Sequence, residues 1–314
     1  MYSRLIGTGA YLPENIVTND DLSKKVDTSH EWISSRTGIH QRHIVSGGEN
    51  AVNMALHAAQ QAIEIAGVSV EDIDLVIFSS CSPDQLIPSQ AALLHAALGL
   101  KSGVPTFDMN SACAGFVYAS VIADQFIRCQ SASCVLVVGS EVMSRLTDWS
   151  DRSTCVLFGD GAGAVIYKAD SVPGILAHHV GCDGQYSELL KSEKTTEGEF
   201  LRMSGREVFK MAVNTFHEIS NAVLNSLSLS IEDINWMVPH QANVRIIQAA
   251  AKQLNMPMDR IVTTVDKHAN TSAASIPLAL HDGLFNQKCI KSGDYILFLA
   301  FGAGLSWGAF VLKY

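Results

Sequence analysis

An internal repeat is the feature of this sequence that most restricts its fold. Residues 69–78 (SVEDIDLVIF) and 230–239 (SIEDINWMVP) align without gaps, with Ser, Glu, Asp and Ile identical at four positions. Weaker matches surround both segments in the same order, with AVN at 51 and 212, TFD and TVD at 106 and 264, and GAV and GAF at 163 and 308. Such an ordered series indicates two copies of one folding unit. We expect an N-terminal half at residues 1–170 and a C-terminal half at 171–314.

Short apolar runs and helical patterns alternate along both halves. Residues typical of buried strands lie near the N-terminus and at 74–79, 106–109, 134–139, 156–158, 234–238 and 262–265. Helical patterns lie at 51–66, 89–98, 114–128, 243–254 and 272–285. This alternation predicts an α/β protein with mostly parallel strands.

Two further segments bear on this architecture. Residues 295–312 carry no charge, but three glycines divide them, so we expect two buried strands joined by a turn rather than a membrane-spanning helix. The polar stretch 183–200 interrupts the second half. Its composition is typical of a solvated loop, and a lid over a site is the alternative.

Charge and cysteine content exclude several classes of protein. With 22 Lys and Arg against 31 Asp and Glu, the formal net charge is -9, which disfavours a partner that is bound through its nucleic-acid phosphates. Seven cysteines without a C-x-x-C pair disfavour structural zinc and a disulfide framework. The first fifteen residues lack the apolar core of a signal peptide. We therefore expect a cytoplasmic protein that binds neither nucleic acid nor membrane.

Three reactive side chains follow predicted strands, at the edge where parallel α/β sheets bind ligands. Cys113 follows the run 106–109, His240 ends the run 234–238, and Asn270 follows the run 262–265.

Cys113 is the candidate nucleophile because it opens the helical segment 114–128, whose first half carries no charge and should be buried. The unpaired N–H groups and the positive dipole end of such a helix favour a thiolate, so we expect a lowered pKa. Small residues on both sides of Cys113 leave room for a substrate. An inert core cysteine is the alternative, and we interpret three other cysteines in that way: Cys129, Cys134 and Cys155.

Taken alone, His240 is better interpreted as a structural or surface histidine than as a catalytic one. Its position after a predicted strand, between Pro239 and Gln241, makes it a better catalytic candidate than the histidines within helical patterns. The other close candidate is His268, two residues before Asn270. No two histidines stand four apart with an acid between them, so we expect no metal site.

Taken together, these motifs resemble the β-ketoacyl-acyl carrier protein synthase III family of bacterial type II fatty acid synthesis. The resemblance extends over the whole chain and is carried by six motifs: DTSHEWISSRTGIHQRHI from Asp27, SACAGF around Cys113, DRSTCVLFGDGAGAV from Asp151, VPHQANVRI around His240, HANTSAASIP around Asn270 and FGAGLSWG near the end. It implies a thiolase-like fold, in which two duplicated halves form a five-layered αβαβα sandwich, and a homodimer.

The resemblance also implies an acyltransferase reaction and a role for each reactive residue. Cys113 would take the acyl group of an acyl-CoA starter as a thioester. His240 and Asn270 would donate hydrogen bonds to the malonyl thioester of malonyl-acyl carrier protein as it loses carbon dioxide. The oxygen of the acyl-Cys113 carbonyl would lie between the backbone N–H groups of Cys113 and Ala303. No cofactor is implied.

The resemblance further places substrate-binding residues. Trp32 and Arg152 would hold the adenine of CoA. The channel behind it would be lined by six residues: Arg36, Met203, Gly205, Phe209, Ala212 and Asn243. Three basic residues would dock the acyl carrier protein: Lys210, Arg245 and Lys252. Ordinary surface positions are the alternative for Trp32, Arg152 and the basic residues.

Two positions depart from the family pattern. Ala269 follows His268 where the family often has glycine, and Ile87 stands at the pocket edge, near the dimer interface, where Phe is common. The smaller side chain at that edge predicts acceptance of acyl groups longer than acetyl, or branched ones.

Four other interpretations compete with this one. A related condensing enzyme of secondary metabolism, making polyketide or quinolone precursors, is the main alternative. A thiolase needs a second cysteine in its C-terminal glycine loop, and FGAGLSWG has none. A papain-type hydrolase would carry C-G-S-C-W near its start. A non-catalytic member of the fold would not be expected to retain all three reactive residues.

Overall fold

Two mixed β-sheets form the framework of the molecule. The computed structural model describes residues 1–314. The first sheet has the strand order β1-β7-β6-β4-β5 and the second the order β11-β12-β13-β8. The strands of the first sheet are β1 (Tyr2–Tyr11), β4 (Leu75–Ser79), β5 (Thr106–Met109), β6 (Cys134–Glu141) and β7 (Gly161–Asp170). Those of the second are β8 (Ile175–Cys182), β11 (Trp236–Pro239), β12 (Tyr295–Gly302) and β13 (Ser306–Lys313).

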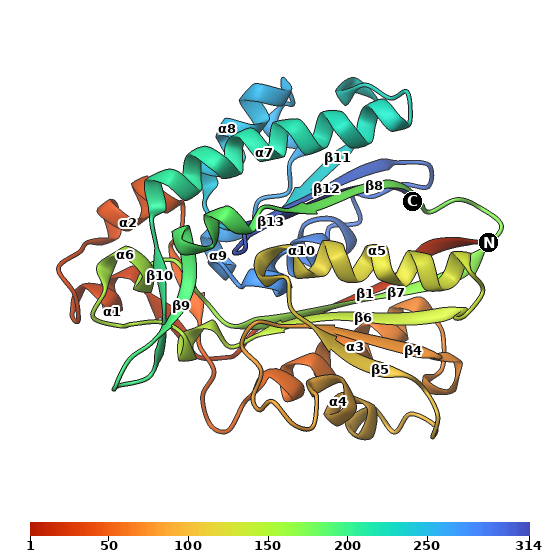
Figure 1. Ribbon diagram of the computed structural model, residues 1–314, viewed down its shortest axis with the longest axis horizontal. Helices are drawn as coiled ribbons and strands as arrows, with labels where there is room; N and C mark the ends of the chain where they lie inside the picture. Colours follow the sequence, from red (N-terminus) through yellow and green to blue (C-terminus); the bar gives the residue numbers. More distant parts are fainter.

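Helices complete five layers, αβαβα, as the family resemblance implied (Figure 1). Outside the first sheet lie α3 (Ala51–Ala66) and α4 (Gln90–Leu98), and outside the second lie α7 (Gly205–Ser226) and α8 (Val244–Leu254). Between the sheets lie α5 (Gly115–Arg128) and α10 (Ser275–Leu280), whose side chains join both sheets in the largest apolar cluster. The remaining elements are α1 (Asn19–Ser23), α2 (His30–Thr37), α6 (Arg152–Cys155), α9 (Val265–His268), the ribbon of β2 (Ile16–Thr18) with β3 (Gln41–His43), and the hairpin of β9 (Leu190–Lys194) with β10 (Glu199–Met203).

Local side-chain chemistry explains where the outer helices begin and end. The Asn50 side chain accepts a hydrogen bond from the Asn53 N–H at the start of α3, and Gly67, with φ of 64°, ends it. Asn243 likewise accepts from the Arg245 N–H at the start of α8, and Asn255 ends that helix with φ of 54°.

The repeated decapeptides adopt the same structure. Ser69 and Ser230 each begin a 3-10 turn, η1 (Val70–Asp72) and η5 (Ile231–Asp233), and in both turns the third residue, an aspartate, closes a capping box. Each turn leads into a buried strand, β4 or β11. The division of the chain near residue 170 remains our interpretation of this duplication.

Two expected strands are absent. Residues 156–158 form a turn after α6 with a single bridge from Phe158 to Asn270, and residues 262–265 lead into α9 after a single bridge from Met237 to Ile261. The apolar residues that suggested strands, Val156, Phe158, Val262 and Val265, are buried between other elements. As a result, the second sheet has no counterpart of β5.

Three other expectations concern strand direction and loops. The sheets are not mostly parallel: three neighbouring pairs are parallel and four antiparallel. The stretch 183–200 is not a loop but a short turn, η4 (Gly184–Leu189), followed by most of the β9–β10 hairpin. Residues 295–312 form the two buried strands expected, β12 and most of β13. No helix of the chain combines the length and the hydropathy of a membrane span.

Candidate active site

One cavity brings Cys113, His240 and Asn270 together. It has a volume of about 120 Å³, and 17 of its 23 lining residues are hydrophobic. Cys113 comes from the 3-10 turn η2 (Ala112–Ala114), His240 from the end of β11, and Asn270 from the link between α9 and the turn η7 (Ser272–Ala274). Their side chains lie in a nearly dry site, since the three residues are 7%, 3% and 7% exposed.

A sharp backbone turn sets the position of Cys113. Ala112 has a φ of 45°, in the left-handed region, and its N–H donates to the Asn110 side chain at 2.9 Å. The chain therefore turns from β5 into α5 with Cys113 at the wall of the cavity. Burial raises the pKa of the Cys113 thiol to about 12, and a hydrogen bond with the Ser272 side chain opposes that rise only in part. Our prediction of a lowered pKa is wrong, because the loss of water outweighs the effect of the helix start.

Gly302, at the end of β12, lies against the backbone of Cys113. A Cβ atom placed on Gly302 would be 2.7 Å from the Cys113 nitrogen and 3.0 Å from its Cβ, which leaves no room for a side chain. The next residue, Ala303, lines the cavity, and its N–H donates to no other group of the chain. This arrangement fits the predicted pair of backbone donors.

His240 is held as a neutral ring. Its Nδ1 is 2.6 Å from the Ser275 Oγ, which also accepts a hydrogen bond from the Gln241 N–H at 3.3 Å. When the Ser275 hydroxyl donates to Nδ1, the ring proton stands on Nε2, where it is available to a ligand. Burial lowers the pKa of His240 to about 3, so the ring is uncharged at neutral pH.

Asn270 is fixed through its backbone and its side-chain oxygen. Its N–H donates to the Leu157 carbonyl at 2.9 Å, and its carbonyl accepts from the Gly159 N–H at 3.1 Å. The Oδ1 atom accepts from the Ser272 N–H at 2.9 Å, which leaves the amide nitrogen free to donate to a ligand. Leu157 and Gly159, which belong to the first half, thus position the Asn270 side chain, which belongs to the second half.

A second cavity of about 430 Å³ opens toward α2 and shares five residues with the first. The shared residues are Leu157, Met203, Gly205, Phe209 and Asn243. At the far end, the Trp32 ring has the guanidinium carbons of Arg36 and Arg152 at 5.1 Å and 5.0 Å from its centroid. Ala212 lines the inner cavity only. The expected substrate-binding residues, Ile87 excepted, therefore follow one path from the surface to Cys113.

The three basic residues expected at a docking surface are exposed at the outer side of this path. Lys210 lies on α7, and Arg245 and Lys252 lie on α8. Arg245 also lines the second cavity, with its guanidinium 6.0 Å from the Phe209 ring centroid.

Ile87 lies apart from this path. It is 88% exposed on the segment between β4 and α4, next to Leu86, which is 87% exposed. It lines neither cavity.

Several residues of the site escaped the sequence analysis. Glu141, at the end of β6, is fully buried and accepts hydrogen bonds from the Ser80 hydroxyl at 3.0 Å and from the Cys81 and Ala273 N–H groups at 3.0 Å and 3.4 Å. Burial raises its pKa. Glu141 could have been predicted from the sequence, because it is an acidic residue at the end of a long apolar run. The others are Cys81, Ser272, Ser275, Gly302 and, at the channel mouth, Arg206.

No three His, Cys, Asp or Glu side chains are grouped so that they could hold a metal ion. The site offers instead one thiol, one neutral imidazole, one amide and free backbone N–H donors in an apolar cavity.

Family models match both parts of the chain that carry these groups. Residues 107–184 match the model described as 3-oxoacyl-[acyl-carrier-protein (ACP)] synthase III, and residues 224–314 match the model of the C-terminal part of that family. The beta-ketoacyl-[acyl-carrier-protein] synthase III of Thiobacillus denitrificans is 50% identical over 318 residues, which cover 100% of this chain and 99% of the relative. That of Methylococcus capsulatus is 49% identical over 320 residues, with the same coverage.

Solved structures agree with these relatives. The 3-oxoacyl-[acyl-carrier-protein] synthase III of Aquifex aeolicus VF5 superposes with a TM-score of 0.96 at 46% identity, covering 99% of this chain and 100% of that one. The priming beta-ketosynthase of the R1128 polyketide pathway superposes with a TM-score of 0.94 at 34% identity, covering 99% and 96%. The predicted thiolase-like fold is confirmed, and the chain belongs to the 3-oxoacyl-[acyl-carrier-protein] synthase III family of acyltransferases.

Proposed function

We propose that this chain condenses an acyl-CoA starter with malonyl-acyl carrier protein through an acyl-Cys113 intermediate, releasing CoA and carbon dioxide. The observation that carries the proposal is the meeting of Cys113, His240 and Asn270 in one apolar cavity at the end of a channel from the surface. The product, a β-ketoacyl-acyl carrier protein, is the starting unit of fatty acid synthesis.

Acyl loading uses the thiol of Cys113. The sulfur attacks the thioester carbonyl of the acyl-CoA, and the new carbonyl oxyanion lies between the N–H groups of Cys113 and Ala303. The bond to the CoA sulfur then breaks, and CoA leaves with the proton that Cys113 gives up. Because the resting thiol has a pKa of about 12, this proton leaves only as the sulfur bonds to carbon.

Decarboxylation uses donors rather than a base. Loss of carbon dioxide from the malonyl group moves an electron pair onto the thioester oxygen, and His240 Nε2–H and the Asn270 amide stabilise that enolate. Each such donor contributes on the order of 3 kcal/mol in a transition state. An apolar cavity also favours the neutral product, because a buried carboxylate loses its hydration. The enolate carbon then attacks acyl-Cys113, and the released thiolate takes a proton from water.

Trp32, Arg36 and Arg152 form the binding site for the adenine end of CoA in this proposal. The Trp32 ring is suited to stack on a purine, and the two guanidinium groups near it are suited to attract phosphates. Within its own chain Ile87 lines none of these cavities, so we place it at the acyl pocket of a second copy of the chain. A side chain smaller than Phe at that position lets starters longer than acetyl be accepted. A loading rate that falls steeply beyond two carbons would contradict this wider range.

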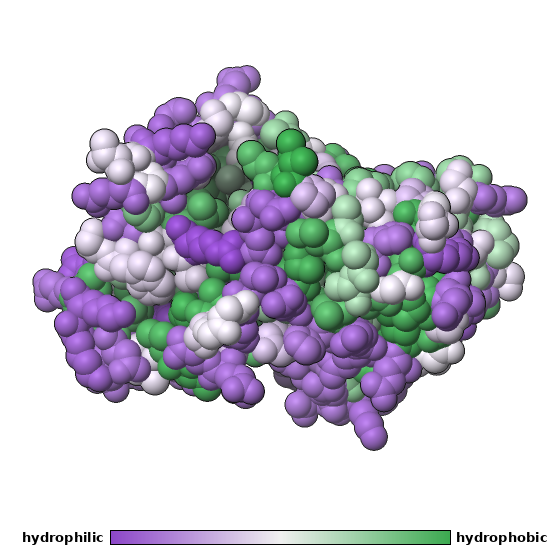
Figure 2. Space-filling model, turned by 90° about the horizontal axis from the view of Figure 1, so that it is seen from below, coloured by the Kyte–Doolittle hydropathy of each residue, from purple (hydrophilic) through white to green (hydrophobic).

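A second copy of the chain completes the molecule. β5 is an unpaired edge strand of the first sheet, and Leu86 and Ile87 are exposed nearby. The face on the side of α4 and β5 carries apolar side chains among polar ones (Figure 2). Sedimentation equilibrium is expected to give the mass of a dimer for the wild-type protein, and Leu86→Asp with Ile87→Asp is expected to shift it to the monomer.

Incubation with isotopically labelled acetyl-CoA tests the central step. Mass spectrometry is expected to find one acetyl group on the peptide that contains Cys113, and none in Cys113→Ala. Cys129→Ala, which removes an exposed thiol, is the matched control and keeps the label. A folded wild-type protein that stays unlabelled would remove the transferase step.

A condensing enzyme of secondary metabolism is the second candidate, favoured by the 34% identity to the R1128 priming ketosynthase. The extender substrate distinguishes the two. Equal turnover of malonyl-CoA and malonyl-acyl carrier protein would favour the secondary-metabolic enzyme, and a strong preference for the carrier protein favours fatty acid synthesis.

A further inference from the structure

The loop between β4 and α4, residues 80–89, forms part of the cavity wall and is held at two points, by Glu141 and by Arg145. The first is Glu141, whose buried carboxylate accepts hydrogen bonds from the N–H groups of Cys81 and Ser82 at 3.0 Å and 3.1 Å. These bonds fix the start of the loop, where the Cys81 Sγ lies 3.4 Å from the same carboxylate.

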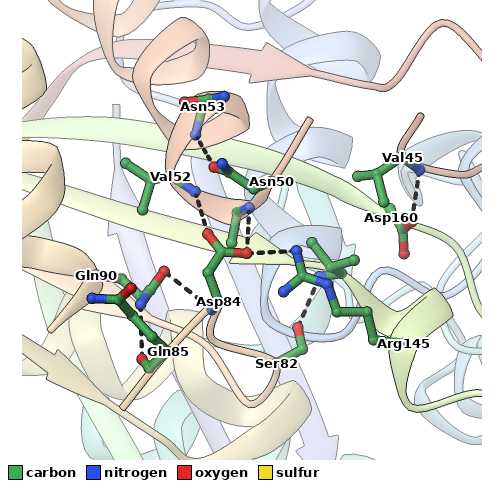
Figure 3. Close-up of polar contacts among 12 residues, drawn as sticks. Val45, Asn50, Val52, Asn53, Ser82, Asp84, Gln85, Gln90, Arg145 and Asp160 are labelled. Carbon is green, nitrogen blue, oxygen red and sulfur yellow. Dashed lines mark hydrogen bonds and ion pairs between the residues drawn. The ribbon is translucent and has the colours of Figure 1, made fainter. Parts of the chain in front are cut away.

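The second point is an ion pair between Asp84 and Arg145, which lies four residues beyond Glu141 (Figure 3). The Asp84 carboxylate is 2.6 Å from the Arg145 guanidinium and also accepts the N–H groups of Ala51 and Val52, both at 3.2 Å. The Asp84 N–H donates to the Gln90 side chain at 3.2 Å. The middle of the loop is thus tied to α3, to α4 and to the segment after β6 at once.

This loop contributes to the boundary between two spaces. Beyond the cavity at Cys113 lies another cavity of about 730 Å³. The two share four residues, Cys81, Ala112, Leu201 and Ala303. Three further loop residues, Ser82, Pro83 and Leu86, line the larger cavity, and so does Arg145. The position of the loop therefore decides how much space a chain attached to Cys113 finds behind the sulfur.

We propose that Arg145 is a positioning residue for acyl-chain selection, which acts by holding Asp84 and with it the loop that carries Cys81 and Leu86. The proposal rests on the proposed function, because it concerns the acyl group carried by Cys113. A two-carbon acyl group stays at the sulfur and reaches no further into the loop than Cys81, which Glu141 holds. A chain of eight carbons must pass Cys81 into the larger cavity, where the loop bounds it.

The test compares acyl loading of Cys113 from acetyl-CoA and octanoyl-CoA in the wild type and in Arg145→Ala. Freeing the loop is expected to change the ratio of the two loading rates by about tenfold, since small displacements at a binding site have effects of this size or larger. The acetyl rate itself is expected to change by less than about threefold, because the contacts at the sulfur remain. Arg145→Lys keeps the charge and is expected to return the ratio toward that of the wild type.

Arg128→Ala is the matched control. Arg128 is 35% exposed against 40% for Arg145, and it pairs with Asp124 on α5 at 2.6 Å, but it lines neither cavity. It is expected to leave the ratio unchanged. Should Arg145→Ala fail to fold, Asp84→Asn breaks the same pair with a side chain of the same shape.

The outcomes separate this inference from the proposed function. Equal changes in both loading rates in Arg145→Ala would overturn the positioning role and leave acyl transfer intact. A wild-type protein that loads neither acyl group would overturn the proposed function itself. A ratio that moves in Arg145→Ala and in Arg128→Ala alike would show a general loss of rigidity, which also contradicts the inference.

Discussion

At the scale of single residues, burial acts on the reactive groups more strongly than any local charge. It raises the pKa of Cys113 to about 12 and lowers that of His240 to about 3. Both shifts favour the uncharged form, as expected where water is excluded. The site is therefore suited to chemistry that begins and ends with neutral groups, and the charge that develops in between must be met by N–H donors.

The lowered pKa of His240 predicts a dependence of stability on pH. The unfolded chain binds a proton at this histidine below a pKa of about 6.5, whereas the folded chain binds it only near pH 3. The unfolded state thus holds more protons between these values, so stability is complete above pH 6.5 and falls as the pH is lowered.

Replacing the His240 ring removes its contribution to the pH dependence of stability. Between pH 7.5 and pH 5 the wild type is expected to lose about 2 kcal/mol more unfolding free energy than His240→Gln. Urea unfolding at the two pH values measures the difference. Asn270→Ala, a variant of the same cavity without a titratable group, is expected to keep the wild-type pH dependence, and an equal loss in His240→Gln would show that the ring is not held neutral.

Cys113 and His240 could be predicted from the sequence because each follows a strand, β5 or β11. Asn270 was predicted from a strand at 262–265 that does not form, and only its motif, HANTSAASIP, placed it correctly. The supports of these three residues could not be predicted. Ser275 and Ser272 act through hydrogen bonds of 2.6 Å to the His240 ring and 2.9 Å to the Asn270 side chain, which only the fold creates. The pKa of Cys113 was mispredicted for a related reason, since a helix start is visible in a sequence and the degree of desolvation is not.

At the scale of elements, close packing of backbones joins the two halves at the site. The end of β12 lies against η2, and the bridge from Phe158 to Asn270 connects the segment after α6 to the start of η7. The sequence predicted strands at 156–158 and 262–265 because buried turns and buried strands have the same apolar composition. It did find β12 and β13, since their run of apolar residues is longer and glycines divide it.

The contact of β12 with η2 predicts the effect of Gly302→Ala. A methyl group 2.7 Å from the Cys113 nitrogen must displace either the strand or the turn that carries the thiol. Such overpacking costs about 1–3 kcal/mol of stability, and a shift of the nucleophile is expected to lower the acyl loading rate by about 100-fold.

Stopped-flow loading and thermal unfolding measure the two effects of Gly302→Ala. The control is Gly184→Ala, because an added Cβ at Gly184 meets nothing within 4 Å. It is expected to match the wild type in both measurements. An unchanged loading rate in Gly302→Ala would mean that acyl loading does not depend on the present position of the Ala303 N–H.

At the scale of the whole molecule, the channel opens between α2, α7 and α8, on the side of the second sheet away from α4 (Figure 1). The five layers could be predicted from the repeat and the resemblance. The lack of a fifth strand in the second sheet could not, because the matching segments TFD at 106 and TVD at 264 form a strand in one half and the start of α9 in the other. Asn270, which lines the same cavity as Cys113, follows directly after this departure from symmetry.

The net charge of -9 conflicts with an acidic carrier protein as partner unless a local basic surface receives it. Lys210 and Lys252, exposed beside the channel on α7 and α8, supply that surface in our proposal. Charges at the rim of an interface act mainly through the association rate and are screened by salt. Lys210→Glu and Lys252→Glu are each expected to lower kcat/KM for malonyl-acyl carrier protein by about five- to tenfold at low salt, and by less at high salt.

Two controls isolate docking from chemistry in these variants. Acyl loading from acyl-CoA does not involve the carrier protein and is expected to stay unchanged. Lys101→Glu, at an exposed position beside α4 on the opposite side of the molecule, makes the same change of charge and is expected to keep the wild-type kcat/KM. If Lys101→Glu lowers the value as much as the other two variants do, the effect comes from net charge, and the partner does not dock between α7 and α8.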